Sequence, residues 1–395
     1  MLLISACTRT GVEPASSPPL GKVSQKKALQ DMVSMQETGR VMPAAAIAPQ
    51  FRMPREPLDR ETYADIDDNP LHRVAETPVS TFSIDVDTGA YSNVRRILNA
   101  GRLPPNDAVR VEELINYFNY ADAAPTHPDT PFAVYTEVGP TPWNADTRLL
   151  RIGIKAWEPP RNARPPANLV FLVDVSGSMS DPDKLPLLKR SLRLLSDQLT
   201  AADRVSMVVY AGASGVVLES TPGNKKARIH AALENLEAGG PTNGASGIRL
   251  AYEQARDGYI KDGINRVLIA TDGDFNVGNV DHDTLIDLIE HQSRDGIALT
   301  TLGFGGGNYN DALMEQLADH GNGNHAYIDT LQEARKVLVD ELGATLQTVA
   351  SDVKIQIEFN PAQVSEYRLI GYQNRLLARE DFNNDSVDAG EIGAG

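Results

Sequence analysis

From residue 168 onward, short apolar runs alternate with amphipathic stretches, and this alternation constrains the fold more than any other feature of the chain. The amphipathic stretches carry apolar residues at steps of three and four, as in Leu185, Leu188 and Leu192, which predicts helices. The apolar runs are short, rich in Val, Ile, Leu or Thr and nearly continuous, which indicates strands buried on both faces of a parallel sheet. We therefore predict an α/β domain with a doubly wound, mostly parallel sheet over 161–350. The predicted strands span 168–175, 203–211, 264–271, 297–305 and 325–328.

A different pattern precedes this domain. Residues 94–101 and 109–120 have helical periodicity, and residues 132–139 and 147–157 alternate with period two, as strands do. Together they predict a small α+β domain over 76–160. The second helix is expected to bury one apolar face, made of Val111, Leu114, Ile115 and Phe118.

The remaining segments are a tether, a linker and a further domain. Residues 1–75 are rich in Pro, Ser, Ala and Gln and carry few strand patterns, which is typical of a flexible tether. A proline-rich linker at 158–167 precedes the α/β domain. Two predicted strands, 353–360 and 364–372, open a β-rich domain over 351–395 that we expect to be clipped at its end.

Composition excludes several classes of function. The net charge of −16 would repel the phosphates of nucleic acid. No stretch reaches the roughly 18 apolar residues that a membrane-spanning helix needs. The single cysteine, Cys7, rules out intrachain disulfides, so the fold must rest on its apolar core.

Oxygen-bearing side chains gather where predicted strands end. Asp174, Ser176 and Ser178 follow the first strand of the α/β domain, Thr242 lies in the glycine-rich stretch GGPTNG, and Asp272 follows the strand at 264–271. Carboxylates and hydroxyls are the ligands that Mg²⁺ or another hard divalent cation such as Mn²⁺ or Ca²⁺ prefers. Two carboxylates only neutralise such an ion, so an Asp or Glu of a protein partner can complete its shell. This pattern favours binding over a structural metal cage.

The order of these motifs carries a resemblance. DVSGSM, GGPTNG and TDGDFN resemble the metal-ion-dependent adhesion site (MIDAS) of von Willebrand factor type A (VWA) domains, with Pro241 as a small departure. The resemblance implies a VWA (Rossmann-like) fold, a protein-binding rather than enzymatic role, and a metal site at matching positions. The flanking sequences STFSIDVDTGAYSNVRR and EYRLIGYQNR resemble the YfbK-type bacterial VWA lipoproteins. The five matching positions are Asp174, Ser176, Ser178, Thr242 and Asp272.

Cys7 follows Ile-Ser-Ala, which resembles the lipobox of bacterial lipoproteins. In that family the signal peptide is cleaved before the cysteine, which then carries the lipid. The resemblance implies a protein anchored by lipid to a membrane of the bacterial cell envelope, facing the periplasm. No basic region precedes the cysteine here, so either the true start lies upstream or the match is accidental.

A second motif leaves an enzymatic alternative open. FSIDVDTG matches the D-x-D-T pattern of haloacid-dehalogenase-type phosphatases, in which Asp85 would attack phosphorus and Asp87 would act as general acid. Such an enzyme needs an alternating α/β pattern around the motif, and that pattern starts some eighty residues later. The simpler interpretation is a turn in which Asp87 or Thr88 caps a helix.

Three further patterns have plain structural interpretations. Ser178 alone is a good helix cap. Residues 303–308, GFGGGN, suggest a phosphate loop but lack its Lys-Ser/Thr, so we expect a turn before a helix. Asp381, Asn383 and Asp385 are spaced as in a calcium loop, which at its sixth and twelfth positions would need a Gly and a Glu that this chain lacks.

Overall fold

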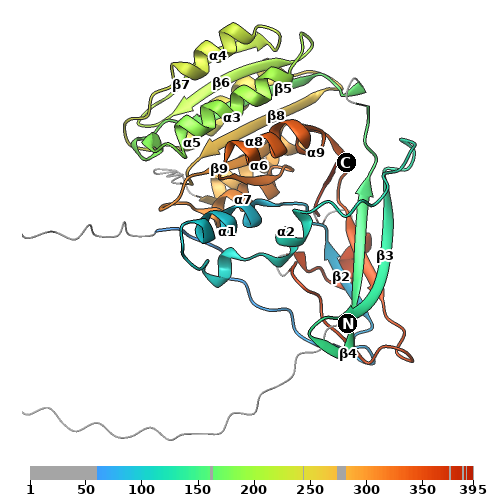
Figure 1. Cartoon of the computed structure of the whole chain (residues 1–395). Helices are drawn as coiled ribbons and strands as arrows, with labels where there is room; N and C mark the ends of the chain where they lie inside the picture. Colours follow the sequence, from blue (N-terminus) through green and yellow to red (C-terminus); the bar gives the residue numbers. More distant parts are fainter. Residues whose placement is uncertain are drawn as a thin grey trace, which may run out of the picture. The chain divides into compact units, whose positions relative to one another are not determined.

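The computed structural model describes residues 60–160, 163–242, 244–273, 282–372, 375–384, 387 and 389–394 (Figure 1). All of these residues belong to one compact unit. Residues 1–59 of the predicted tether, Cys7 among them, lie outside the described residues, whereas residues 60–75 are described and include the strand β1 (His72–Arg73) and the buried Val74.

A six-stranded sheet forms the centre of this unit. Its strands are β5 (Ala167–Asp174), β6 (Arg204–Tyr210), β7 (Ser214–Pro222), β8 (Ile264–Thr271), β9 (Ala298–Phe304) and β10 (His325–Ile328). The order across the sheet is β10-β9-β8-β5-β6-β7, and every neighbouring pair is parallel except β6 and β7. The predicted doubly wound, mostly parallel α/β fold is confirmed. The edge strand β7 was not predicted, because its outward side chains interrupt the apolar pattern.

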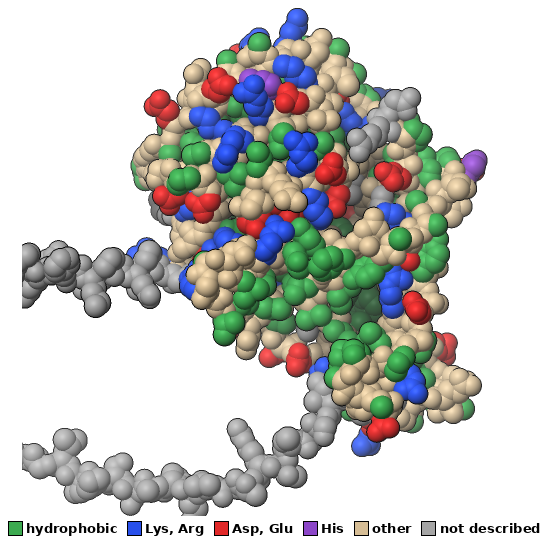
Figure 2. Space-filling view, viewed as in Figure 1, with side chains coloured by type: hydrophobic (Ala, Val, Ile, Leu, Met, Phe, Trp, Pro, Cys, Tyr) green, Lys and Arg blue, Asp and Glu red, His purple; other side chains and the backbone are tan. Residues whose placement is uncertain are grey.

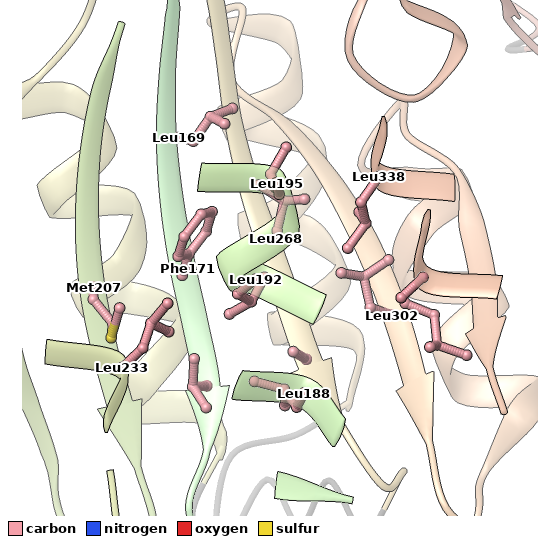
Figure 3. Close-up of a cluster of buried hydrophobic side chains, with 14 of the residues drawn as sticks. Leu169, Phe171, Leu188, Leu192, Leu195, Met207, Leu233, Leu268, Leu302 and Leu338 are labelled. Atoms are coloured by element: carbon pink, nitrogen blue, oxygen red, sulfur yellow. The ribbon is translucent and has the colours of Figure 1, made fainter. Parts of the chain in front are cut away.

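Helices cover both faces of the sheet. Alternate residues of β5 point to opposite faces, so Leu169 and Phe171 belong to one buried cluster while Val170 and Leu172 belong to the other. Figure 3 shows the first cluster, in which leucines of α3 lie over Phe171 and its neighbours on the sheet. The helical elements of this part of the chain are η3 (Gly177–Ser180), α3 (Leu185–Gln198), α4 (Lys226–Glu234), α5 (Gly244–Asp257), α6 (His282–Arg294), α7 (Asp311–His320), α8 (Leu331–Arg335), the π-helix η4 (Lys336–Asp340) and α9 (Leu342–Leu346).

The two helical layers divide these elements. The cluster around Phe171 draws on α3, α4, α8 and η4, whereas the cluster around Leu172 draws on α5, α6 and α7. Burial of complete leucine side chains stabilises such a core by about 1.5–3 kcal/mol each. Among the described residues, no helix is both long and apolar enough to cross a membrane.

The segments before and after the sheet pair with each other. β2 and β12 form an antiparallel ladder, as do β1 and β13, while β3 and β4 form a long hairpin. The predicted domain boundaries remain a prediction. The two ladders join the first flank, which is the described chain before β5, to the last flank, which is the described chain after α9. The flanking elements are β1 (His72–Arg73), β2 (Val79–Ser83), α1 (Gly89–Asn99), η1 (Asn106–Ala108), α2 (Val111–Asn116), β3 (Phe132–Thr141), β4 (Asn144–Ala156), β11 (Thr348–Ala350), β12 (Lys354–Glu358), β13 (Glu366–Tyr367), η6 (Arg379–Asn383) and β14 (Ile392–Gly393).

The predicted buried face of α2 is wrong. Val111, Ile115 and Phe118 are 38%, 46% and 51% exposed, and Figure 2 shows hydrophobic side chains gathered on the surface over this helix. The helix instead buries Glu112 and Glu113. The reason is electrostatic, because Glu113 pairs with the buried Arg110 at 3.0 Å and accepts the N–H of Ala90 at 2.7 Å.

A carboxylate ties the start of β5 to the start of β6. Asp203 accepts hydrogen bonds from the backbone of Ala167 at 2.8 Å and of Thr200 at 2.7 Å, and from Arg164 at 2.8 Å. Burial alone would raise the pKa of Asp203, but these two N–H donors and the guanidinium hold it below its ordinary value. The ionised carboxylate therefore stabilises the fold.

We predict that Asp203→Asn lowers the free energy of unfolding at pH 7 by about 1.5–3 kcal/mol, since hydrogen bonds to a charged group are lost. The folded-state pKa is depressed, so the stabilisation is present above about pH 4, the ordinary carboxyl pKa, and is lost as the pH falls through the folded-state value. Urea denaturation of both proteins between pH 3 and pH 7 measures this. Asp197→Asn, at a carboxylate 47% exposed, is the matched control and should change little.

Candidate metal centre

The two predicted acids lie on adjacent strands in the middle of the sheet. Asp174 is the last residue of β5 and Asp272 directly follows β8, and these strands pair in parallel with Val173 opposite Ala270. The chain runs from β5 outward to β6 and β7, and then returns to the other side of β5 as β8. In open α/β sheets, ligands bind at the carboxyl ends of strands where the order reverses in this way.

Asp174 is fully buried and held by three donors. Its Oδ1 accepts the N–H of Ser176 at 2.8 Å, and its Oδ2 accepts the hydroxyls of Thr271 at 2.7 Å and Tyr210 at 3.2 Å. Burial raises the pKa of Asp174 to about 6, against the lowering effect of the Ser176 and Thr271 donors, and the charge of Asp272 adds to the rise. The carboxylate has one fixed orientation at the strand end.

The two serines do not cap the helix that follows. Ser176 occupies the position before η3 in an extended conformation, yet its side chain makes no capping hydrogen bond. Its hydroxyl instead lies 3.0 Å from the hydroxyl of Ser178. The capping interpretation of these serines therefore has no support in their described contacts, and the paired hydroxyls are placed to act together.

The glycine-rich loop that leads to Thr242 contacts the residues that follow Asp174. Gly239 donates its N–H to the carbonyl of Val175 at 2.7 Å, and the carbonyl of Gly240 accepts the N–H of Gly177 at 3.0 Å. Gly240 has φ +85°, a left-handed conformation that glycine adopts without strain. Thr242 follows two residues later and is half-buried. All five predicted site residues thus lie at one edge of the sheet or on the loops that contact it.

A lysine that the sequence reasoning missed is part of the site. The ammonium of Lys184 donates to Asp272 Oδ2 at 2.9 Å and to Asn308 Oδ1 at 3.0 Å, and Asn308 donates to the same Asp272 oxygen at 3.3 Å. Asp272 is fully buried. Lys184 occupies the N-cap position of α3, where the positive end of the helix dipole disfavours a cation. No local sequence pattern signalled this contact, because Asp272 lies 88 residues further along the chain.

The donor set suits a hard cation. Two carboxylates and three hydroxyls are oxygen ligands of the kind that Mg²⁺ takes while keeping part of its water shell. Among the described residues, no group of three or more His, Cys, Asp or Glu side chains could hold a metal ion. The candidate set contains only two acids, so hydroxyls must supply the remaining ligands.

The alternative acids, Asp85 and Asp87, lie elsewhere and make structural contacts. Asp87 accepts the N–H of His325 at 2.9 Å, and Asp85 accepts the N–H of Asp87 at 2.9 Å and lies 3.6 Å from the guanidinium of Arg375. Both line a cavity of about 260 Å³ that also includes Asp319. Burial, together with the charges of neighbouring acids, raises the pKa of Asp87 well above its ordinary value. These bonds join the first flank to β10 and to the last flank.

The two other candidate loops have different outcomes. The glycine-rich stretch 303–308 follows β9 and precedes α7, as expected for a turn, and it delivers Asn308 to the site. In the predicted calcium loop, Asp381 and Asn383 belong to η6, whereas Asp385 lies outside the described residues.

Comparison with known families agrees with this topology. The family model described as von Willebrand factor type A domain matches residues 168–341, that described as von Willebrand factor matches 57–151, and that described as uncharacterized protein YfbK, C-terminal, matches 344–395. The chain is also 52% identical to the uncharacterized protein YfbK of Escherichia coli K12 over 339 residues, which cover 84% of this chain and 59% of that protein.

The chain is a VWA-domain protein of the YfbK type.

More distant VWA likenesses accompany this assignment. The uncharacterized protein sll0103 of Synechocystis is 32% identical over 187 residues, which cover 47% of this chain and 43% of that protein. A structure of proximal thread matrix protein 1 from the mussel byssus, with a zinc-occupied MIDAS motif, is 19% identical with a TM-score of 0.36, covering 45% of each chain. The VWA chain described here spans about six-tenths of the length of YfbK and less than half of sll0103.

We predict that Thr271→Val destabilises the VWA domain by about 1–3 kcal/mol, because the buried carboxylate of Asp174 loses its shortest side-chain donor. Valine keeps the shape of threonine, so the change isolates the hydroxyl. Tyr210→Phe removes the longer bond to the same oxygen and should cost less. Thermal unfolding of wild type, Thr271→Val and Tyr210→Phe measures the loss of stability in each variant. Equal stability of Thr271→Val and wild type would contradict the prediction.

Proposed function

We propose that this protein binds a hard divalent cation at the end of β5 and uses it to capture an acidic side chain of a protein partner. The cation would be Mg²⁺, or Mn²⁺ or Ca²⁺ in its place. The observation that carries the proposal is the pairing of the Ser176 and Ser178 hydroxyls beside the buried Asp174, at the switch point of the sheet. Neither helix capping nor core packing accounts for that arrangement. The proposed ligands are Asp174, Ser176, Ser178, Thr242 and Asp272.

The residues suit capture rather than permanent enclosure of an ion. Asp174 is oriented by Thr271 and Ser176, so its carboxylate needs no rearrangement. Ser178 and Thr242 are only partly buried, which leaves the outer side of the site open to a partner. A bound divalent ion would supply a Lewis-acidic position for the partner's carboxylate. The hydroxyls add no charge, so the ion keeps its attraction for that carboxylate.

The role proposed is binding rather than catalysis. The alternative, a metal-dependent phosphatase using Asp85 and Asp87, receives less support from the contacts of these residues. Asp87 holds the backbone of His325. The same cavity is lined by four acids, Asp85, Asp87, Asp319 and Glu391, against Arg375 and His320, so a phosphate would meet net repulsion there. We propose instead that this pair fastens the flanks to the VWA domain.

We further propose that the protein acts at the bacterial cell envelope. The segment before residue 60 would serve as the tether, since residues 60–75 belong to the compact unit, and Cys7 would carry the lipid that holds the protein on a membrane, facing the periplasm. The support is the Ile-Ser-Ala-Cys sequence together with the polar, proline-rich composition that follows it. Mass spectrometry of the mature, full-length protein tests this, since an unmodified Cys7 would remove the anchor.

We predict that Asp174→Asn weakens Mg²⁺ binding by about tenfold or more, because a carboxylate ligand becomes a neutral amide. Calorimetric titration with MgCl₂ measures the affinity. Asp257→Asn, at an exposed carboxylate of α5, is the matched control and should bind Mg²⁺ as the wild type does. Equal affinity of Asp174→Asn and wild type would refute the assignment, and phosphate-ester hydrolysis that Asp85→Asn abolishes would favour the phosphatase.

Partner capture should depend on the same residue and on the cation. In a crosslinking pulldown, we expect a partner recovered by wild type in Mg²⁺ to be lost with EDTA and with Asp174→Asn. Asp197→Asn, a change at an exposed acid of α3, serves as the control for net charge. Recovery that is the same for wild type and Asp174→Asn would contradict capture through the metal.

A further inference from the structure

Lys184 places its ammonium group at the proposed cation site. Its side chain is 5% exposed, and its ammonium contacts Asp272 at 2.9 Å. Its stem lies against Gly305, where an added Cβ would come within 2.3 Å of the lysine side chain. Gly305 also has φ +65°, so the loop after β9 is shaped to admit this stem. The lysine is therefore seated in the structure rather than resting on its surface.

The placement of Lys184 is unfavourable without Asp272. The residue begins α3, where the unpaired backbone N–H groups carry partial positive charge. A buried ammonium also loses its hydration, which only a closely placed carboxylate can offset. The attraction of Asp272 therefore holds Lys184 in place, and Lys184 in turn neutralises one of the two acids of the site.

A divalent cation and the ammonium need the same carboxylate. Asp272 Oδ2 already accepts bonds from Lys184 and Asn308. A cation drawn to Asp174 and Asp272 would meet the repulsion of the ammonium at short range, which a partly buried site screens poorly. Metal binding is thus opposed by the lysine for as long as it stays on Asp272.

We propose that Lys184 is the built-in counter-ion of the site and that cation binding requires it to release Asp272. This inference rests on the proposed function. Asn308 would hold the ammonium of Lys184 after its release from Asp272, because Asn308 Oδ1 accepts a separate hydrogen bond from that ammonium at 3.0 Å. The site then has two states, a closed one in which Lys184 pairs with Asp272 and an open one in which the cation does. Reciprocal linkage requires that whatever stabilises one state weakens the other.

The test is calorimetric titration of the full chain with MgCl₂ at fixed ionic strength. Lys184→Met keeps the length of the side chain and removes its charge, and we expect it to bind Mg²⁺ about tenfold more tightly than wild type or better. Lys184→Arg keeps the charge and should not gain affinity. Lys189→Met is the matched control on the same helix, because its ammonium contacts only the carbonyls of Glu234 and Leu236 and lies outside the site.

A second readout does not depend on the titration. Without metal, Lys184→Met removes the ammonium that pairs with the buried carboxylate of Asp272, so we expect its melting temperature in EDTA to be lower than that of wild type. Added Mg²⁺ should raise the melting temperature of Lys184→Met more than that of wild type. If Lys184→Met fails to fold, Lys184→Gln replaces it, since its amide can still donate to Asp272 while carrying no charge.

The outcomes separate this inference from the proposed function. Mg²⁺ binding that is tighter in Lys184→Met or Lys184→Gln than in wild type supports the counter-ion role. Binding that is detected in these variants and not in wild type also supports it. Binding by wild type with equal or weaker binding by Lys184→Met and Lys184→Gln overturns it and leaves the cation site standing. If wild type and both neutral variants bind none of Mg²⁺, Mn²⁺ and Ca²⁺, the cation site itself is wrong and the coupling falls with it.

Discussion

The parallel pairing of β5 with β8 is the constraint on which the rest of the structure depends. Helices cover both faces of the sheet, and an acid stands at the carboxyl end of each of these two strands, Asp174 as the last residue of β5 and Asp272 directly after β8. The register that places Val173 opposite Ala270 also places Asp174 beside Thr271, whose hydroxyl fixes it. Packing of apolar side chains thus determines the position of the polar ones, and the glycine-rich loops add their hydroxyls and Asn308 around that fixed point.

Buried ion pairs join the flanks to this sheet domain. Arg110, which is 3% exposed, contacts Glu113 of its own flank and Asp311 and Glu315 of α7. Arg375 contacts Asp85 from one flank and Asp319 from α7. Removing one partner of such a buried pair costs about 3–5 kcal/mol, because the other charge stays behind without compensation. Pairing of acids with basic side chains therefore holds the flanks on the sheet domain. The same kind of pair, between Lys184 and Asp272, is proposed to control cation binding at the site.

Much of the sheet domain could be predicted from sequence, and the exceptions have physical reasons. Runs rich in Val, Ile, Leu and Thr identified β5, β6, β8, β9 and β10, since strands buried on both faces are mostly apolar and do not alternate with polar residues. The edge strand β7 has one solvated face and lacked that signal. On α2, periodicity misled, because Arg110 draws Glu113 inward and turns Ile115 and Phe118 outward. The positions of the two site acids follow from strand ends, but Lys184 and Asn308 meet Asp272 only through tertiary contacts that no local pattern encodes.

The ladder between β2 and β12 has a mechanical consequence. Val79 lies opposite Glu358 and Ser83 opposite Lys354, so the chain enters and leaves this ladder at the same end. Tension applied across this ladder through its two outer ends would break its hydrogen-bonded pairs one after another, starting at Val79 and Glu358. It would not load all of the pairs together in shear. Residues 84–353, which include the whole central sheet, form a closed loop beyond the ladder. The ladder does not shield that loop, because the preceding segment also reaches into it, where Thr62 exchanges backbone hydrogen bonds with Tyr309 and Asp311, and the following segment does so where β14 pairs with β11. Tension on the preceding segment would therefore reach the loop beside Asn308 before it reached the ladder.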